Sequence, residues 1–293
     1  MELNISVYIQ LWIFEGNLMQ KDTLLEGMAK IARQAGAAIL EVYDRADFSV
    51  VSKADDSPLT AADLAAHRII VDALAELAPD IPVLSEESDE ISFAERSSWT
   101  TYFLVDPLDG TKEFINRNGE FTVNIALIEH HKPVLGAVYV PVQDKLYLGN
   151  VEAQQATRET VDGSKPIRCR QLNGKNVTVV ASRRHGSDAL VSLMANLEKR
   201  YEVATENVGS SLKFCLIAEG EADLYPRFAP TSEWDTGAAQ ALVVAAGGQV
   251  VNLDFEPLDY NAKENILNPH FVVFADPEVD WQGIISLSNL SEP

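Results

Sequence analysis

Helical periodicity marks the first part of the chain. Apolar residues recur three or four positions apart across residues 23–43, which predicts a long amphipathic helix. The same spacing over residues 62–77 predicts a second helix, and Thr60 fits the N-cap position in front of it. Pro79 and Pro82 end this pattern. Two successive helices are therefore expected ahead of the first strand.

Short apolar runs between turn residues predict strands farther along. The run "IPVL" leads to Glu86, the run "YFLV" stops at Asp106, and "FTVNIALIEHHKPVLGAVYVP" predicts two strands joined at residues 130–133. The second half adds, in order, a strand "VTVVAS", a helix over residues 187–199, a helix "SSLKFCLIAEG", a strand "ADLYPRF" and a helix "WDTGAAQALVVAAGG". This alternation predicts an α/β (α+β layered) fold in which helix and sheet layers alternate.

Three segments of the chain differ in character. Residues 1–20 are predicted to be an N-terminal extension, residues 21–158 an α+β domain, and residues 159–293 an α/β domain that contains Asp235. The boundary is placed where the sequence becomes polar and mixed, at residues 151–170.

The extension contains an apolar run that resembles part of a signal peptide. It lacks the basic region and the small-residue cleavage site of a secretory signal, and it is shorter than the roughly 20 apolar residues that cross a bilayer. We therefore expect a cytoplasmic protein, and the run leaves open a weak peripheral contact with the cytoplasmic side of the inner membrane. The sequence predicts no oligomeric state.

Charge and cysteine content exclude several classes of function. With 44 acidic residues against 23 Lys and Arg, the formal net charge is −21, which argues against binding a nucleic-acid polymer. A small anionic substrate remains compatible with a few local cations. Cys169 and Cys215 lie far apart without metal-ligand spacing, so neither a disulfide framework nor a zinc site is expected.

Carboxylates stand at the ends of several predicted elements. Glu86 follows one strand, Asp106 and Asp109 follow another in "VDPLDGT", and Asp235 begins a helix. Mg²⁺ prefers oxygen ligands and often keeps waters and a substrate phosphate, so acids that converge in this way predict a magnesium site. The carbonyl of Leu108, after Pro107, is a candidate for a further ligand.

The residues that follow predict a phosphate site beside the metal. Gly110 allows the backbone to pass close to an anion, and Thr111 would begin a helix over "TKEFI", whose free N–H groups favour a phosphate. Two cations there would polarise the phosphate and activate a water. Each residue also has a plainer interpretation: "DPLDG" as a surface turn, Asp235 as an N-cap, and Glu86 as part of a solvated acidic loop.

These motifs resemble a known family. "LSEE", "VDPLDGTKEF", "FTVNIAL" and "WDTGAA" resemble the Mg²⁺-dependent, lithium-sensitive phosphatase superfamily of inositol monophosphatase. "VSKADDSPLTAAD", "NGEFTVNIAL", "GSSLKFCLIAEGEADLYPRF" and "LNP" are similar, more narrowly, to bacterial 3′(2′),5′-bisphosphate nucleotidases of the CysQ type. The resemblance covers about residues 24–273 and implies an αβαβα sandwich.

The resemblance also implies roles for individual residues. Two or three Mg²⁺ ions would be held by Glu86, Asp106, Asp109, Asp235 and the Leu108 carbonyl, and the catalytic residues would be Asp63, Thr111 and Glu86. Thr111 and Asp63 would orient and help to deprotonate the attacking water. The implied substrate-binding residues are Asp109, Gly110, Thr111, His185, Ser210, Lys213, Arg227 and Asp235. Lys53 is placed near the metal site. Asp63 fits a helix first turn as well, Arg227 a solvated strand end, and His185 a loop.

The implied reaction is hydrolysis of the 3′-phosphate of adenosine 3′,5′-bisphosphate, which gives AMP and phosphate and removes an inhibitory by-product of sulfate assimilation. Inhibition by millimolar Li⁺ is implied too. One alternative is an inositol monophosphatase or sugar-phosphate phosphatase of the same superfamily, for which Lys213 and Arg227 would have little use. The other is a non-catalytic sensor that binds metal or phosphate without turnover.

Overall fold

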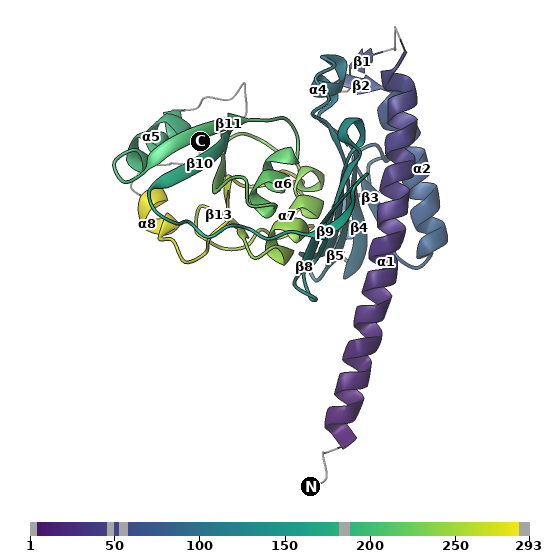
Figure 1. Cartoon of the computed structure of the whole chain (residues 1–293). Coiled ribbons are helices and arrows are strands. Elements are labelled where there is room, and N and C mark those ends of the chain that lie inside the picture. Colours follow the sequence, from purple (N-terminus) through teal and green to yellow (C-terminus); the bar gives the residue numbers. More distant parts are fainter. Residues whose placement is uncertain (1–4, 46–49, 53–57, 182–187, 287–293) are drawn as a thin grey trace.

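The structure is a computed structural model that describes residues 5–45, 50–52, 58–181 and 188–286. Five layers follow one another across the molecule in Figure 1: helices α1 and α2, a large sheet, helices α6 and α7, a second sheet, and helices α5 and α8. The predicted alternation of helix and sheet layers is confirmed. Hydrophobic residues from neighbouring layers fill the space between them.

The outer layer on one side is built by the two predicted helices. α1 spans Ile5–Tyr43 and α2 spans Ala61–Leu77, and both contribute buried residues to the core under the large sheet. α1 begins well before residue 23, so the helix continues into the extension and projects beyond the sheet in Figure 1. Among the described residues, every helix is too short or too polar to traverse a bilayer.

The large sheet has seven strands in the order β3-β4-β5-β6-β7-β8-β9. All neighbours are antiparallel except β3 and β4. The bounds are β3 Val83–Ser85, β4 Thr101–Asp109, β5 Thr122–Glu129, β6 Lys132–Val140, β7 Lys145–Asn150, β8 Gln155–Thr160 and β9 Gly163–Pro166. The hairpin predicted at residues 130–133 is confirmed between β5 and β6. The boundary predicted after residue 158 falls inside β8, and a division into two domains stays a proposal.

The second sheet has five strands in the order β11-β10-β12-β14-β13. The bounds are β10 Asn176–Ala181, β11 Glu202–Asn207, β12 Leu224–Arg227, β13 Gln249–Asn252 and β14 Phe271–Phe274. Its helices are α5 Asp188–Leu197 and α8 Trp281–Ser286 outside, with α6 Leu212–Ala218 and α7 Gly237–Ala245 between the sheets. The short elements are β1 Val50–Ser52, β2 Pro58–Thr60, α3 Phe93–Arg96, α4 Thr111–Ile115 and the 3₁₀ helices η1 Pro141–Gln143 and η2 Glu233–Asp235.

Two glycines allow α7 to pack directly on the backbone of the large sheet. A Cβ placed on Gly136 of β6 would lie 2.1 Å from the carbonyl oxygen of Ala238, and one on Gly149 of β7 would lie 2.6 Å from Cα of Leu242. Neither contact can be relieved by rotating a side chain, because both involve backbone atoms. α7 can therefore lie this close to the large sheet only because Gly136 and Gly149 have no side chain.

We predict that Gly136→Ala lowers the free energy of unfolding by about 1–3 kcal/mol, the usual cost of overpacking a core. Urea denaturation measures this change. Gly27→Ala is the matched control, since the nearest atoms to its Cβ would be side-chain carbons of Leu77, which can move without shifting the backbone. If the two variants were equally stable, the close approach of α7 would not constrain the fold.

Candidate active site

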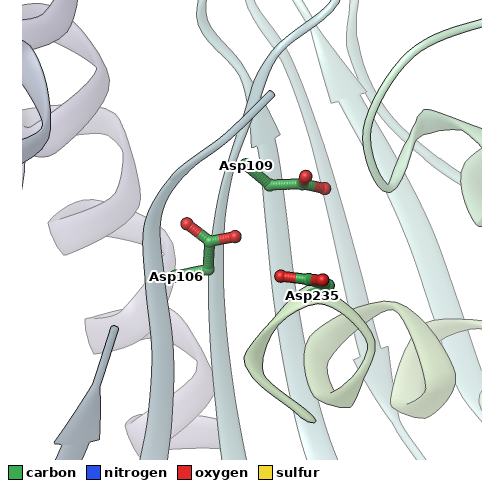
Figure 2. Close-up of side chains that lie close together, drawn as sticks. All are labelled: Asp106, Asp109 and Asp235. Atoms are coloured by element: carbon green, nitrogen blue, oxygen red, sulfur yellow. The ribbon is translucent and has the colours of Figure 1, made fainter. Parts of the chain in front are cut away.

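Three aspartates from two parts of the chain meet at one point. Asp106 and Asp109 come from β4 and Asp235 from η2, and one oxygen of each lies within 4.8 Å of the others. Figure 2 shows the three carboxylates turned toward a shared space between β4 and the η2 turn. Asp106 is buried, whereas Asp109 and Asp235 are half-buried. The predicted convergence of these acids is therefore seen in the structure.

An irregularity in β4 brings its two aspartates to the same site. Residues three apart in a regular strand point to opposite faces of the sheet. Here Asp106 pairs with Asn124 and Asp109 with Thr122, so three steps along β4 match two along β5. One extra residue in a strand re-aims the side chains beyond it. The backbone N–H of Leu108 donates to Asp106 Oδ1 at 3.0 Å, which fixes the bulge.

Glu86 lies against the same cluster. It follows β3, and its backbone N–H donates to the carbonyl of Val105 at 3.1 Å, so it is held beside the end of β4. Its negative charge helps to raise the pKa of Asp106, Asp109 and Asp235. The structure thus brings all four predicted acids together.

The electrostatics of this cluster favour a bound cation. Burial, and then the neighbouring carboxylates, raise the pKa of Asp106 well above its usual value. The pKa of Asp235 is raised in the same way, and burial raises that of Asp109 to about 6 although Lys213 and the N–H of Ser211 oppose the shift. Like charges held this closely disfavour one another unless a cation lies between them. Four carboxylates in a cleft fit a hard divalent cation such as Mg²⁺.

Asp63 and Thr111 are in contact beside the cluster. The Thr111 hydroxyl lies 3.2 Å from Asp63 Oδ1 and 3.4 Å from the carbonyl oxygen of Leu108. Asp63 Oδ2 accepts from the backbone N–H of Thr60 at 2.8 Å and from its hydroxyl, which completes a capping box on α2. Burial raises the pKa of Asp63, while the hydrogen bonds from Thr60 oppose the shift.

Gly110 stands at the turn between β4 and α4. Its φ of 98° is one that favours glycine, and a Cβ there would lie 3.1 Å from the carbonyl oxygen of Glu120. The predicted helix over "TKEFI" is confirmed as α4, which has only five residues. A phosphate site at its first turn stays a prediction.

A pocket opens beside Asp109 and Asp235, and three cationic residues line it: Lys112, Lys213 and Arg227. Lys213 is 5% exposed, and its Nζ donates to the carbonyl of Ser210 at 2.9 Å. Arg227 donates from Nε and Nη2 to the carbonyls of Ala229 and Pro230. The pocket is lined by Asp109, Gly110, Lys112, Glu113, Glu120, Val208, Gly209, Ser210, Ser211, Lys213, Phe214, Tyr225, Arg227, Thr231, Asp235, Thr236 and Phe271. Ser210, Lys213 and Arg227 therefore lie together next to the acids, whereas His185 and Lys53 fall outside the described residues.

Among the lining residues that the sequence did not single out, Ser211 and Glu120 make contacts that shape the pocket. The backbone N–H of Ser211 donates to Asp109 Oδ2 at 2.6 Å, and its hydroxyl contacts Asn124 and Thr122. Glu120 Oε2 accepts from the N–H of Gly209 at 2.8 Å. These contacts dock the 208–213 segment on the large sheet. In the sequence, only Gly209 and Ser210 ahead of an apolar helix indicated a turn here. No sequence pattern indicated that this turn contacts the large sheet.

Comparison of this chain with known proteins identifies the class of protein to which it belongs. A sequence model of the inositol monophosphatase family matches residues 20–279, so the chain belongs to the inositol monophosphatase family. A protein from Escherichia coli O157:H7 named 3′(2′),5′-bisphosphate nucleotidase CysQ is 52% identical over 251 residues, which cover 85% of this chain and 99% of that protein. The crystal structure of CysQ from Bacteroides thetaiotaomicron, a bacterial member of the family, matches with a TM-score of 0.77 and 42% identity, over 88% of this chain and 98% of that one.

A more distant structure supports the fold alone. An inositol monophosphatase from Thermotoga maritima matches with a TM-score of 0.72 at 21% identity, covering 90% of this chain and 96% of that one. The layered fold predicted from the sequence is therefore the one shared by this family.

We predict that Lys213 makes stability rise with pH above about 8. Burial lowers the pKa of this lysine from 10.5 to about 8 in the folded protein. Between these values the unfolded chain holds a proton that the folded chain has lost, so raising the pH favours the folded state by up to about 1.4 kcal/mol per pH unit. Relative to Lys213→Met, the wild type should gain stability between pH 8 and 10.

Urea denaturation at several pH values, without metal, measures this difference. Lys175→Met is the control, because Lys175 is exposed. A pH-independent gap between wild type and Lys213→Met would contradict the prediction.

Proposed function

We propose that this protein is a 3′(2′),5′-bisphosphate nucleotidase that hydrolyses the 3′-phosphate of adenosine 3′,5′-bisphosphate. The reaction consumes water and the nucleotide and gives AMP and inorganic phosphate. It thereby recycles a by-product of sulfur assimilation. One observation carries the proposal: three converging aspartates, with Glu86 beside them, adjoin a pocket that also holds Lys213 and Arg227. The 52% identical relative bears this enzyme's name. A cytoplasmic location and lithium sensitivity stay predictions.

The acid cluster is proposed to hold two or three Mg²⁺ ions. Glu86, Asp106, Asp109, Asp235 and the carbonyl of Leu108 would supply the protein's ligands. When bound, such ions polarise phosphoryl oxygens and lower the pKa of a coordinated water. The raised pKa values of the aspartates support this assignment, because a cation would remove the repulsion that causes part of the shift. Metal affinity should fall at acid pH, where these ligands become protonated.

Thr111 and Asp63 are proposed to handle the proton of the attacking water. The Thr111 hydroxyl already donates toward Asp63 Oδ1, so it can accept a proton from water while it passes its own to the carboxylate. A raised pKa makes Asp63 a better base than an exposed aspartate. The capping hydrogen bonds from Thr60 hold the carboxylate in this orientation.

Lys213, Arg227 and Ser210 are proposed to bind the nucleotide. Lys213 acts electrostatically on Asp109, so its ammonium group lies close to the position of the scissile phosphate. Arg227 contacts backbone carbonyls through Nε and Nη2, which orients its guanidinium group at the pocket for a charged phosphate. The Ser210 hydroxyl is buried without a partner among the described residues, and a substrate oxygen would supply one. His185 stays a predicted contact.

A panel of phosphate monoesters tests the substrate assignment. With Mg²⁺ present, we predict a higher kcat/KM for adenosine 3′,5′-bisphosphate than for inositol 1-phosphate, because the cationic side chains of Lys213 and Arg227 in the pocket favour a substrate with two phosphate groups. Phosphate release is the measurement. A preference for the inositol compound would favour the inositol monophosphatase alternative, and Mg²⁺ binding without release from any substrate would favour a sensor.

Asp109→Asn should lower kcat by more than about 100-fold, since loss of an outer partner of a metal ligand alone commonly costs 10–100-fold. The fold should survive, because the asparagine oxygen can still accept from the N–H of Ser211. Steady-state kinetics and circular dichroism measure the two effects. Asp80→Asn, at an exposed turn, is the control. Nearly normal turnover in Asp109→Asn would remove this residue from the metal site.

A further inference from the structure

Glu233 is a buried carboxylate that does not line the substrate pocket. It lies two residues before Asp235 in η2 and is 0% exposed. Its Oε2 accepts from the backbone N–H of Asn261 at 2.7 Å, and its own backbone N–H donates to the carbonyl of Ile266 at 2.9 Å. A buried carboxylate is costly unless it is hydrogen-bonded, so its place here calls for a structural or functional reason.

The partner of Glu233 is held in turn by an arginine from the other half of the chain. Arg96, at the end of α3, is 5% exposed and donates to Asn261 Oδ1, while the Asn261 amide group donates back to the carbonyl of Arg96. Arg96 also donates to the carbonyls of Lys263 and Glu264. The Asn261 backbone has a φ of 55°, which is uncommon for a residue other than glycine. One arginine thus fixes a loop at three residues.

A second contact fixes the same loop to the Asp235 turn. The side-chain amide of Asn268 donates to the carbonyl of Ser232 at 2.8 Å and to the Thr236 hydroxyl at 3.0 Å. Its backbone N–H donates to the carbonyl of Thr231 at 2.8 Å. The loop over residues 261–268 therefore contacts residues that precede Asp235 in the sequence and one that follows it. Arg96 joins that loop to the segment that enters β4 five residues later.

This arrangement opposes the repulsion within the acid cluster. Asp106 and Asp109 belong to β4 and Asp235 to η2, so the cluster stays together only if β4 and η2 are held against each other (Figure 2). We propose that Arg96 and Glu233 are positioning residues that, through Asn261, hold Asp235 at metal-binding distance from the β4 aspartates. This inference rests on the proposed metal-dependent function.

The test measures metal affinity in addition to activity. Without substrate, Mg²⁺ should bind Arg96→Met and Glu233→Ala at least about tenfold more weakly than wild type, in the range typical of residues that support metal ligands. Calorimetric titration gives the affinity. In assays, the half-saturating Mg²⁺ concentration should rise while kcat at saturating Mg²⁺ recovers. Glu233→Gln should behave like wild type, because its carbonyl oxygen can still accept from Asn261.

Arg170→Met provides the matched control. Arg170 is likewise held by several hydrogen bonds, here in an ion pair with the buried Asp223 just before β12 of the second sheet. Its loss should lower the melting temperature without changing Mg²⁺ affinity. If Arg170→Met weakened Mg²⁺ binding as much as Arg96→Met, or if Glu233→Ala bound Mg²⁺ like wild type, the inference would be overturned. Should Arg96→Met fail to fold, the Glu233→Ala and Glu233→Gln pair decides the question. A wild-type protein that neither binds Mg²⁺ nor hydrolyses the nucleotide would overturn the proposed function itself.

Discussion

Repulsion between carboxylates is the constraint around which the rest of this structure is arranged. Glu86 follows β3, Asp106 and Asp109 belong to β4, and Asp235 belongs to η2; burial together with their neighbours raises the pKa of the three aspartates. Such a cluster destabilises the folded protein when no cation is bound, and a divalent cation that binds between the acids stabilises it. The scaffold must therefore hold the acids together before the cation arrives, and metal binding should stabilise the fold.

The layers supply that rigidity. α7 follows the Asp235 turn directly and packs on the backbone of β6 and β7, because Gly136 and Gly149 leave room for it. β4 lies in the interior of the same sheet, so both sources of aspartate are tied to one body. Contacts from the 208–213 segment and from the loop over residues 261–268 then fix the sides of the pocket.

Local sequence patterns predicted much of this arrangement, but they do not show which residues far apart in the chain are in contact. The helix period, the Thr60 cap and the strand ends that carry Asp106 and Asp109 are visible within a few residues of sequence. β8 and β9 were missed because their residues are mostly polar and, in β9, exposed, so they lack the apolar alternation of a half-buried strand. Ser211 and the pair of Glu233 and Asn261 were missed because their partners lie 28 or more residues away. The roles assigned to Ser210, Lys213 and Arg227 came from family resemblance, and the structure places these three side chains in one pocket.

The interpretation of Asp63 as an acid in the first turn of a helix is compatible with its predicted place in the site. Asp235 is not an N-cap: Ser232 is the N-cap of η2, and Asp235 completes its capping box. Asp63 uses Oδ2 to accept from Thr60 and directs Oδ1 to the Thr111 hydroxyl. Asp235 likewise uses Oδ2 to accept from the N–H of Ser232, and it still offers an oxygen to the acid cluster. A carboxylate has two oxygens, so one can lock the orientation of the group while the other meets the metal or the water. Capping also offsets part of the cost of burial, because each N–H that donates to the carboxylate stabilises its charged form. The turn hydrogen bonds that make these residues look ordinary in the sequence are therefore the means by which the fold holds their carboxylates in place at the proposed site.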